Sequence, residues 1–306
     1  GVRQLANKLD VWNPYEFTKY QYERSRGGTA TEQSFLEDYG AYEDIELYKG
    51  VPFVDWQDEV FGRTALMQTY NVGLTGGGKV TQYNISLTSN TEEGIMLGSD
   101  FDRKLLTVRV DNNLGKRLTV GLSGRLNHTI VNGAGTAEPG SSSTNRLRHS
   151  VKYRPFVSVG QPIDYFDPDY AQETSANSLS LINPVLLTQQ EYKQERTKVG
   201  NITGYVSFKI SDFLSLKSSI GYDYNRERTR VFNDTITSAS RSNGSGLPLA
   251  SLNKDNARTV NNSNVLTFTS EGLKNIFGAN HKLDMIVGHE SYEKRTKVDF
   301  AESKLF

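Results

Sequence analysis

Residues 65–74 read ALMQTYNVGL and residues 80–89 read VTQYNISLTS. Both stretches alternate apolar and polar side chains with a period of two, which is typical of a β-strand with one apolar face. In the first stretch that face holds Leu66, Tyr70, Val72 and Leu74. The residues between the stretches read TGGGK and favour a tight turn. The two stretches therefore predict an antiparallel hairpin.

The same alternation continues along the chain. It predicts further strands over residues 103–111, 118–127, 199–210, 214–223, 260–269 and 282–291. On their apolar face the eight predicted strands carry one charge, Lys104. On the other face they carry Arg103, Arg109, Asp111, Arg125, Lys209, Lys217, Asp223, Lys282, Asp284 and Glu290. A charge that faces lipid at mid-membrane costs roughly 2–4 kcal/mol, whereas the wet lumen of a barrel accepts charge.

Alternation alone also fits a soluble antiparallel sandwich, in which the apolar faces form the core. The connections favour a barrel. Residues 75–79, 112–117 and 211–213 are short turns, whereas residues 90–102, 128–198 and 225–258 form longer connections. Short turns at one end and long loops at the other are typical of outer-membrane barrels, and strands of about ten residues can cross a bilayer. We therefore expect an all-β fold, an antiparallel transmembrane β-barrel segment.

The first sixty residues have a different pattern. Asn13 and Pro14 favour the start of a helix, because Asn accepts a capping hydrogen bond and Pro is tolerated in the first turn. The Gly27-Gly28 pair favours its end. A short helix is therefore predicted over residues 15–24, before the first predicted strand.

The amino-acid composition excludes several classes of function. The 306 residues contain 35 Lys+Arg, 35 Asp+Glu and no cysteine. The balanced charge gives no reason to expect nucleic acid as a partner, and thiolate zinc sites and cysteine nucleophiles are excluded. No apolar run is long enough for a membrane-spanning helix, and the N-terminus lacks the pattern of a signal peptide. The chain is therefore expected to be cytosolic, or a piece of a larger protein.

The sequence offers three candidates for a chemical site: residues 73–79, the carboxylates at 55–59 and the histidines. Residues 73–79 resemble a phosphate-binding loop, but Val80 follows where a hydroxyl is needed, so a hairpin turn is favoured. Asp55, Asp58 and Glu59 form a carboxylate cluster without the partners that catalysis needs, and a solvated or structural cluster is favoured. No histidine has the spacing of a metal ligand. We therefore expect no enzyme, no cofactor and no metal.

The loop over residues 164–170 reads DYFDPDY. Its carboxylates lack the spacing of a calcium loop, and its aromatic side chains either fold on themselves or contact a ligand. If the protein is a soluble sandwich, Trp56 and this loop are the candidates for binding carbohydrate. A hydrolase that uses Asp55 or Asp58 is the least favoured alternative.

Several stretches resemble, in order, the SusC/RagA-type TonB-dependent transporters of Bacteroidetes. They are DWQDEVF at 55–61, QTYNVGLTGG at 68–77, TQYNISL at 81–87, EGI at 93–95 and DFDR at 100–103. LDVWN at 9–13, followed by Glu16-Phe17, and KLDMIVGHE at 282–290 fit the same family. The resemblance is dense over residues 1–127 and thinner from there to residue 306.

The resemblance implies a segment from the early-to-middle part of a 22-stranded barrel of the bacterial outer membrane. Residues 1–62 would form the end of the first barrel strand and the first extracellular loop with its helix. Residues 63–306 would form strands with short periplasmic turns and long extracellular loops. The signal peptide, TonB box, plug domain and remaining strands would lie outside this chain.

The resemblance also implies a function in import, with the partners and contact sites that import requires. A SusD-like surface lipoprotein would cap the barrel, TonB–ExbB–ExbD would supply energy through other parts of the protein, and an oligosaccharide or peptide would be the substrate, with outer-membrane lipid around the barrel. Candidates to contact substrate or lipoprotein are Trp56, Tyr165, Phe166 and Tyr170. Candidates to face the lumen are Arg103, Arg109, Asp111, Arg125, Lys209 and Lys217.

Overall fold

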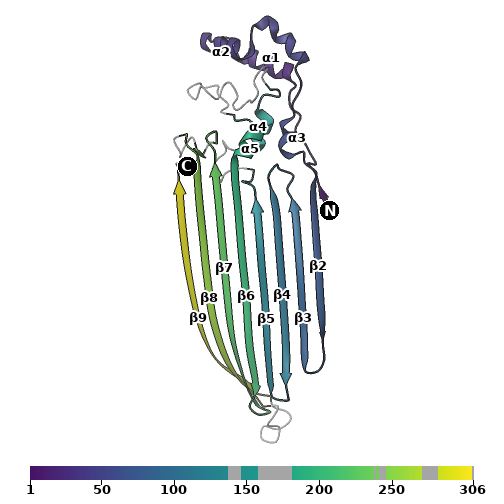
Figure 1. The fold of residues 1–306 in the computed structure, drawn as a ribbon, viewed down its shortest axis with the longest axis vertical. Helices are drawn as coiled ribbons and strands as arrows, with labels where there is room; N and C mark the ends of the chain where they lie inside the picture. Colours follow the sequence, from purple (N-terminus) through teal and green to yellow (C-terminus); the bar gives the residue numbers. More distant parts are fainter. Residues whose placement is uncertain (137–145, 158–180, 238, 241–245, 271–281, 305–306) are drawn as a thin grey trace.

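The computed structural model describes residues 1–136, 146–157, 181–237, 239–240, 246–270 and 282–304. These residues form one antiparallel sheet with the strand order β1-β2-β3-β4-β5-β6-β7-β8-β9. Every strand therefore pairs with the strands that precede and follow it in the chain. Figure 1 shows the strands side by side, with the helices gathered beyond one end of the sheet.

The strands lengthen along the chain. Their bounds are β1 Val2–Arg3, β2 Ala65–Gly77, β3 Thr81–Glu93, β4 Asp100–Leu114, β5 Leu118–Asn132, β6 Glu191–Lys209, β7 Leu214–Asn233, β8 Leu249–Thr269 and β9 Asp284–Ser303. All eight predicted strands are present. They are also longer than predicted, since β7 has 20 residues and β8 has 21.

The longer strands correct three predicted connections. The expected connection 90–102 shrinks because Glu93 pairs with Asp100 and Asn90 with Arg103. The connections 128–198 and 225–258 shrink in the same way, because Asn132 pairs with Gln194 and Asn233 with Leu249. The added residues are mostly polar, so they lack the apolar alternation that marks a strand in the sequence, although their backbones pair like the rest.

The register places most of the apolar residues of β2 to β8 on one face. Val72 lies opposite Leu87, Leu87 opposite Leu106, and Leu106 opposite Leu126. We call this side the apolar face and the other side, which carries Arg109 and its row, the polar face. No second sheet packs on the apolar face within the described residues. The sandwich alternative, which requires two packed sheets, is therefore wrong.

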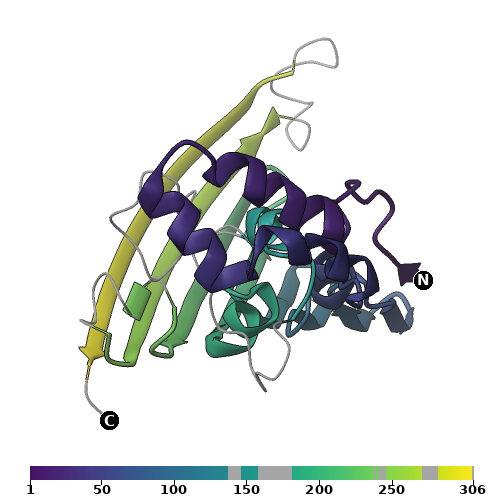
Figure 2. The same ribbon diagram turned by 90° about the horizontal axis from the view of Figure 1, so that it is seen from above.

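Helices form a separate layer that we call the helical cap. They are α1 Pro14–Ser25, α2 Thr29–Tyr39, the 3₁₀ helix η1 Tyr42–Gly50, α3 Trp56–Phe61, α4 Arg146–Lys152 and α5 Pro184–Gln190. Figure 2, the view from above, shows them lying over the ends of the strands. No helix among the described residues has both the length and the apolar character needed to cross a membrane.

The predicted helix is confirmed as α1. The Asn13 side chain accepts a hydrogen bond of 2.9 Å from the Glu16 amide, and the Glu16 carboxylate accepts one of 3.1 Å from the Asn13 amide. This reciprocal capping box satisfies two backbone donors that the first turn leaves unpaired. Buried Phe17, Phe35, Tyr39 and Phe156 then form the core of the cap.

Candidate functional site

The helical cap contains a pocket of about 310 Å³ between α1, the segment of residues 10–12 before it, α3 and α4. Its aromatic lining comes from Trp12, Phe17, Tyr20, Trp56 and Tyr153. Asp10, Gln21 and Lys152 contribute polar groups. Apolar walls with a few polar groups are the usual composition of a ligand pocket. We call this the cap pocket.

Two of the lining residues are strongly exposed. Trp12 is 50% and Tyr20 45% exposed, and their ring centroids lie 4.6 Å apart. The planes of the two rings are tilted by 48°, so together they offer an angled, exposed aromatic surface to an apolar ligand group. Sequence reasoning missed this pair as a site, although Trp12 lies within the 9–13 stretch that carries the family resemblance.

Trp56 was expected to lie in a loop and to be open to a ligand, but the structure places it in a helix and buries it. It is the first residue of α3 and only 6% exposed. Its indole nitrogen donates a 2.7 Å hydrogen bond to the Arg154 carbonyl, and its ring meets Tyr153 edge-on at 5.5 Å. Trp56 thus joins α3 to the segment after α4 and forms the inner wall of the cap pocket. Its burial, which depends on residues about 100 positions away, was not visible in the sequence.

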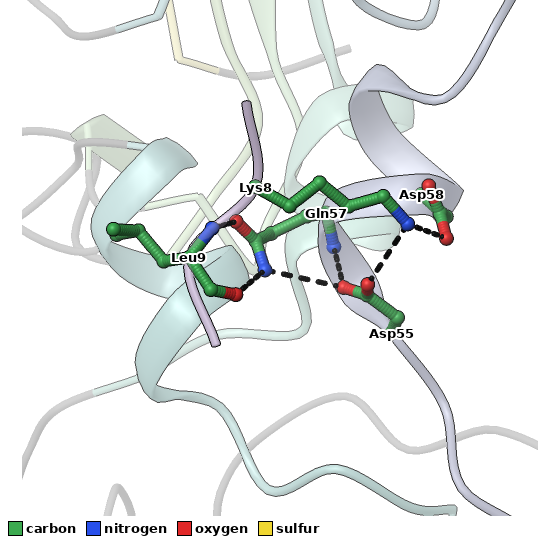
Figure 3. Close-up of polar contacts among 5 residues, drawn as sticks. All are labelled: Lys8, Leu9, Asp55, Gln57 and Asp58. Carbon is green, nitrogen blue, oxygen red and sulfur yellow. Dashed lines mark hydrogen bonds and ion pairs between the residues drawn. The ribbon is translucent and has the colours of Figure 1, made fainter. Parts of the chain in front are cut away.

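The carboxylate cluster near Trp56 holds the cap together (Figure 3). Lys8 pairs with Asp55 at 3.3 Å and also with Asp58. Beside this pair, the Gln57 side chain accepts a 3.0 Å hydrogen bond from the Leu9 amide and donates one of 2.9 Å to the Leu9 carbonyl. For Asp55 and Asp58 the structural interpretation is confirmed, because both pair with Lys8 in the segment that leads to Trp12.

The other predicted contact residues, Tyr165, Phe166 and Tyr170, lie outside the described residues. Among the described residues no group of three or more His, Cys, Asp or Glu side chains has the arrangement of a metal site. The glycines at 76–78 form the end of β2 and the β2–β3 turn. The hairpin interpretation of that stretch is therefore confirmed.

A polar network on the polar face joins side chains from three strands, β4, β6 and β7. Arg109 Nε donates a 2.9 Å hydrogen bond to Asp111, and the Tyr205 hydroxyl donates one of 2.7 Å to the other oxygen of that carboxylate. Lys217 Nζ lies 4.8 Å from the centre of the Tyr205 ring. Three of the predicted lumen residues, Arg109, Asp111 and Lys217, are thus brought together around Tyr205. Tyr205 itself was not predicted as a member.

The remaining predicted lumen residues lie apart from this network on the same face. Arg103 is opposite Asn90 and Thr129, and Arg125 is opposite Thr107 and Asn201. Lys209 lies 3.8 Å from Asp212 in the β6–β7 turn. The polar face is therefore a scattered set of charges with one connected cluster, and not a single compact site.

Comparison with known proteins adds to this geometry. No family model matches the chain. TonB-dependent receptor P39 of Formosa agariphila is 23% identical over 280 residues, which cover 92% of this chain and 23% of that protein. TonB-dependent receptor SusC of Bacteroides thetaiotaomicron is 25% identical over 192 residues, which cover 57% of this chain and 18% of that protein. The chain thus spans about a quarter or less of these relatives.

The fold agrees with a solved structure described as the RagAB peptide transporter. The match has a TM-score of 0.64 at 17% identity and covers 99% of this chain and 35% of that one. Both relatives are named as TonB-dependent receptors. Sequence and fold together confirm that this chain resembles the SusC/RagA-type TonB-dependent transporters, as a segment of their antiparallel barrel.

Proposed function

We propose that the chain is part of a TonB-dependent outer-membrane transporter that imports oligosaccharides or peptides together with a SusD-like lipoprotein. The observation that carries this proposal is the uncovered apolar face. Val72 is 69%, Leu122 50% and Ile220 58% exposed. A continuous apolar surface of this kind requires a partner, and lipid is the partner that fits an antiparallel sheet with a charged opposite face.

In this proposal residues 1–62 belong to the first strand and the first extracellular loop, and residues 63–306 form the barrel wall. The polar face lines the lumen, so the Arg109–Asp111–Tyr205–Lys217 network borders the transport path. The short turns between β2 and β3 and between β4 and β5 face the periplasm. TonB–ExbB–ExbD acts through parts of the transporter other than this chain.

The cap pocket is the proposed first contact for substrate or lipoprotein. Its exposed Trp12–Tyr20 pair suits the apolar face of a sugar ring, and Asp10, Gln21 and Lys152 supply hydrogen-bonding groups. The same chemistry suits an aromatic or aliphatic peptide side chain, and RagAB is described as a peptide transporter. The aromatic lining favours the oligosaccharide, because several of its side chains can stack on sugar rings.

The test is uptake by cells that carry the full transporter. We expect Trp12→Ala to lower uptake of labelled oligosaccharide about tenfold, since losing an aromatic stacking contact costs about 0.5–1.5 kcal/mol beyond its area. Leu47→Ala is the matched control, because Leu47 is a 70% exposed apolar residue of η1 outside the cap pocket.

Labelled peptide in place of sugar would identify the other substrate class. A protein that stays monomeric and folded in water without detergent would refute the barrel. Equal uptake by the Trp12→Ala and Leu47→Ala variants would remove the cap pocket from the transport path.

A further inference from the structure

On the apolar face of β7 the side chains change along the strand from apolar to aromatic to positively charged. Ile220 is followed on the same face by Tyr222 and Tyr224, whose ring centroids lie 6.2 Å apart, and then by Arg226 and Arg228. Apolar residues, then aromatic residues, then cations follow the order expected where a strand leaves the hydrocarbon region for the headgroups. The extension of the strands beyond their predicted ends creates this last, cationic part.

The neighbouring strands β6 and β8 also carry cations, at the same level as those on β7. Arg196 on β6 pairs with Arg228 on β7, and Arg228 pairs with Lys254 on β8. One step lower, Lys198 lies opposite Arg226. We call these residues, with one more on β8, the basic band: Arg196, Lys198, Arg226, Arg228, Lys254 and Arg258.

The basic band places like charges directly opposite one another, an arrangement that destabilises a sheet. Adjacent strands are only about 4.8 Å apart. Within the described residues no ion pair is recorded for any member of the band. Such a row is stabilised when an anion lies across it.

The acidic residues nearby are otherwise engaged or lie on the other side. On β9, Asp299 pairs with Lys297 at 3.0 Å, and Glu293 pairs with Arg295. Glu195, Glu227 and Asp255 alternate with the band along their strands and so occupy the polar face. The basic band therefore remains a net cationic surface on the lipid side of the sheet.

We propose that the basic band binds the phosphate groups of a phosphorylated glycolipid in the outer leaflet of the outer membrane. The proposal rests on the proposed membrane orientation. Successive residues on one face rise about 6.7 Å, so the upper row of Arg196, Arg228 and Lys254 and the next row of Lys198 and Arg226 span about the thickness of one headgroup layer. Arg258 lies one step further along β8. Guanidinium groups match phosphate oxygens in a bidentate geometry, and four of the six residues are arginine.

The test measures lipid binding by the full protein, purified in neutral detergent, with native mass spectrometry. The probes are lipid A with its phosphates, dephosphorylated lipid A and inorganic phosphate alone. The variant is Arg196→Gln/Arg228→Gln/Lys254→Gln, which removes the upper row. Each basic residue near an anionic surface contributes about fivefold, so we expect roughly 100-fold weaker binding of phosphorylated lipid A.

The matched control is Lys79→Gln/Lys116→Gln/Arg117→Gln, which removes the same charge from turns at the opposite end of the sheet. We expect it to bind lipid A like the parent protein. In detergent without anionic lipid, the upper-row variant should unfold at the same or a higher temperature than the parent, because it loses repulsion. The unfolding temperature therefore shows whether the upper row binds lipid or only stabilises the fold.

Several outcomes would overturn the proposal. These are equal binding of phosphorylated and dephosphorylated lipid A, equal binding by the upper-row variant and the parent, and stabilisation by inorganic phosphate alone to the same degree. None of these outcomes bears on uptake through the barrel. A protein that folds as a monomer in water would instead refute the proposed function itself.

Discussion

The Tyr205 hydroxyl on β6 reaches Asp111 on β4, at 2.7 Å, by passing over Gly121 of the strand between them. A Cβ on Gly121 would lie 2.1 Å from Tyr205 Cε1 and 2.7 Å from Asp111 Oδ1. The polar network of the polar face therefore depends on the absence of a side chain at Gly121. Gly76 beneath Tyr83 and Gly200 beneath Tyr224 repeat this glycine–tyrosine pairing.

Gly121→Ala should break the Tyr205–Asp111 hydrogen bond and destabilise the sheet by about 1–3 kcal/mol, because the added methyl group overpacks an occupied site. Thermal unfolding of the full protein in detergent measures the loss. Gly124→Ala is the control on the same strand, since its Cβ would meet nothing closer than the Asn201 carbonyl at 4.0 Å. Equal midpoints for the two variants would contradict the close approach.

Arg146 on α4 and Glu191, the first residue of β6, form an ion pair in which the side chains are 1% and 2% exposed. Arg146 also donates a 2.6 Å hydrogen bond to the Gly135 carbonyl. Arg146→Met should destabilise this junction by about 3–5 kcal/mol, because it removes one charge of a buried ion pair. Faster amide exchange in α4 and early β6, followed by mass spectrometry, is the expected sign.

The double variant Arg146→Met/Glu191→Leu should recover part of that loss, because it removes both charges and replaces them with apolar groups. If the double variant exchanged as fast as the single one, packing rather than charge would explain the effect of Arg146.

The hydrogen bond to Asp58 raises the pKa of Lys8 above its usual value, with a further contribution from Asp55. A lysine whose pKa is raised by folding stabilises the fold below the pKa of the unfolded chain. That stabilisation is lost as the pH rises through the higher, folded value. The Lys8 anchor should thus hold at neutral and mildly alkaline pH and weaken only above about pH 10.5.

Acetylation at pH 8–9 measures this anchor, because only the neutral amine reacts. Asp58→Asn should speed modification of Lys8 several-fold and leave Lys19, on the exposed side of α1, unchanged. Unchanged reactivity of Lys8 in the variant would show that the ion pair does not form in solution.

The central part of the sheet was predictable because apolar and polar residues alternate there along each strand. Strands β6 to β9 continue through stretches such as residues 191–198, where charges occupy both faces and the period of two disappears from the sequence. Backbone pairing needs no apolar residue, so sequence pattern could not find those extensions, and the basic band was missed with them.

The helical cap was predicted only where a local signal existed. The Asn13–Glu16 capping box announces α1. By contrast, Trp56 owes its burial to Tyr153 and Leu181, which are distant in sequence. The register confirms that predicted charged residues such as Arg109 and Lys217 lie on the polar face. The contacts around Tyr205, however, depend on how the strands are aligned with one another, which the alternation within each strand does not fix.

The strand order has a consequence for how the wall is built. Each strand hydrogen-bonds to the one made just before it, so the sheet can grow hairpin by hairpin as the polypeptide is delivered to the membrane. Residues 133–190 interrupt this growth between β5 and β6, and the Arg146–Glu191 pair fixes part of that insertion to the first residue of β6. We expect the addition of β6 to be the slow step of assembly, because it must close this long loop first.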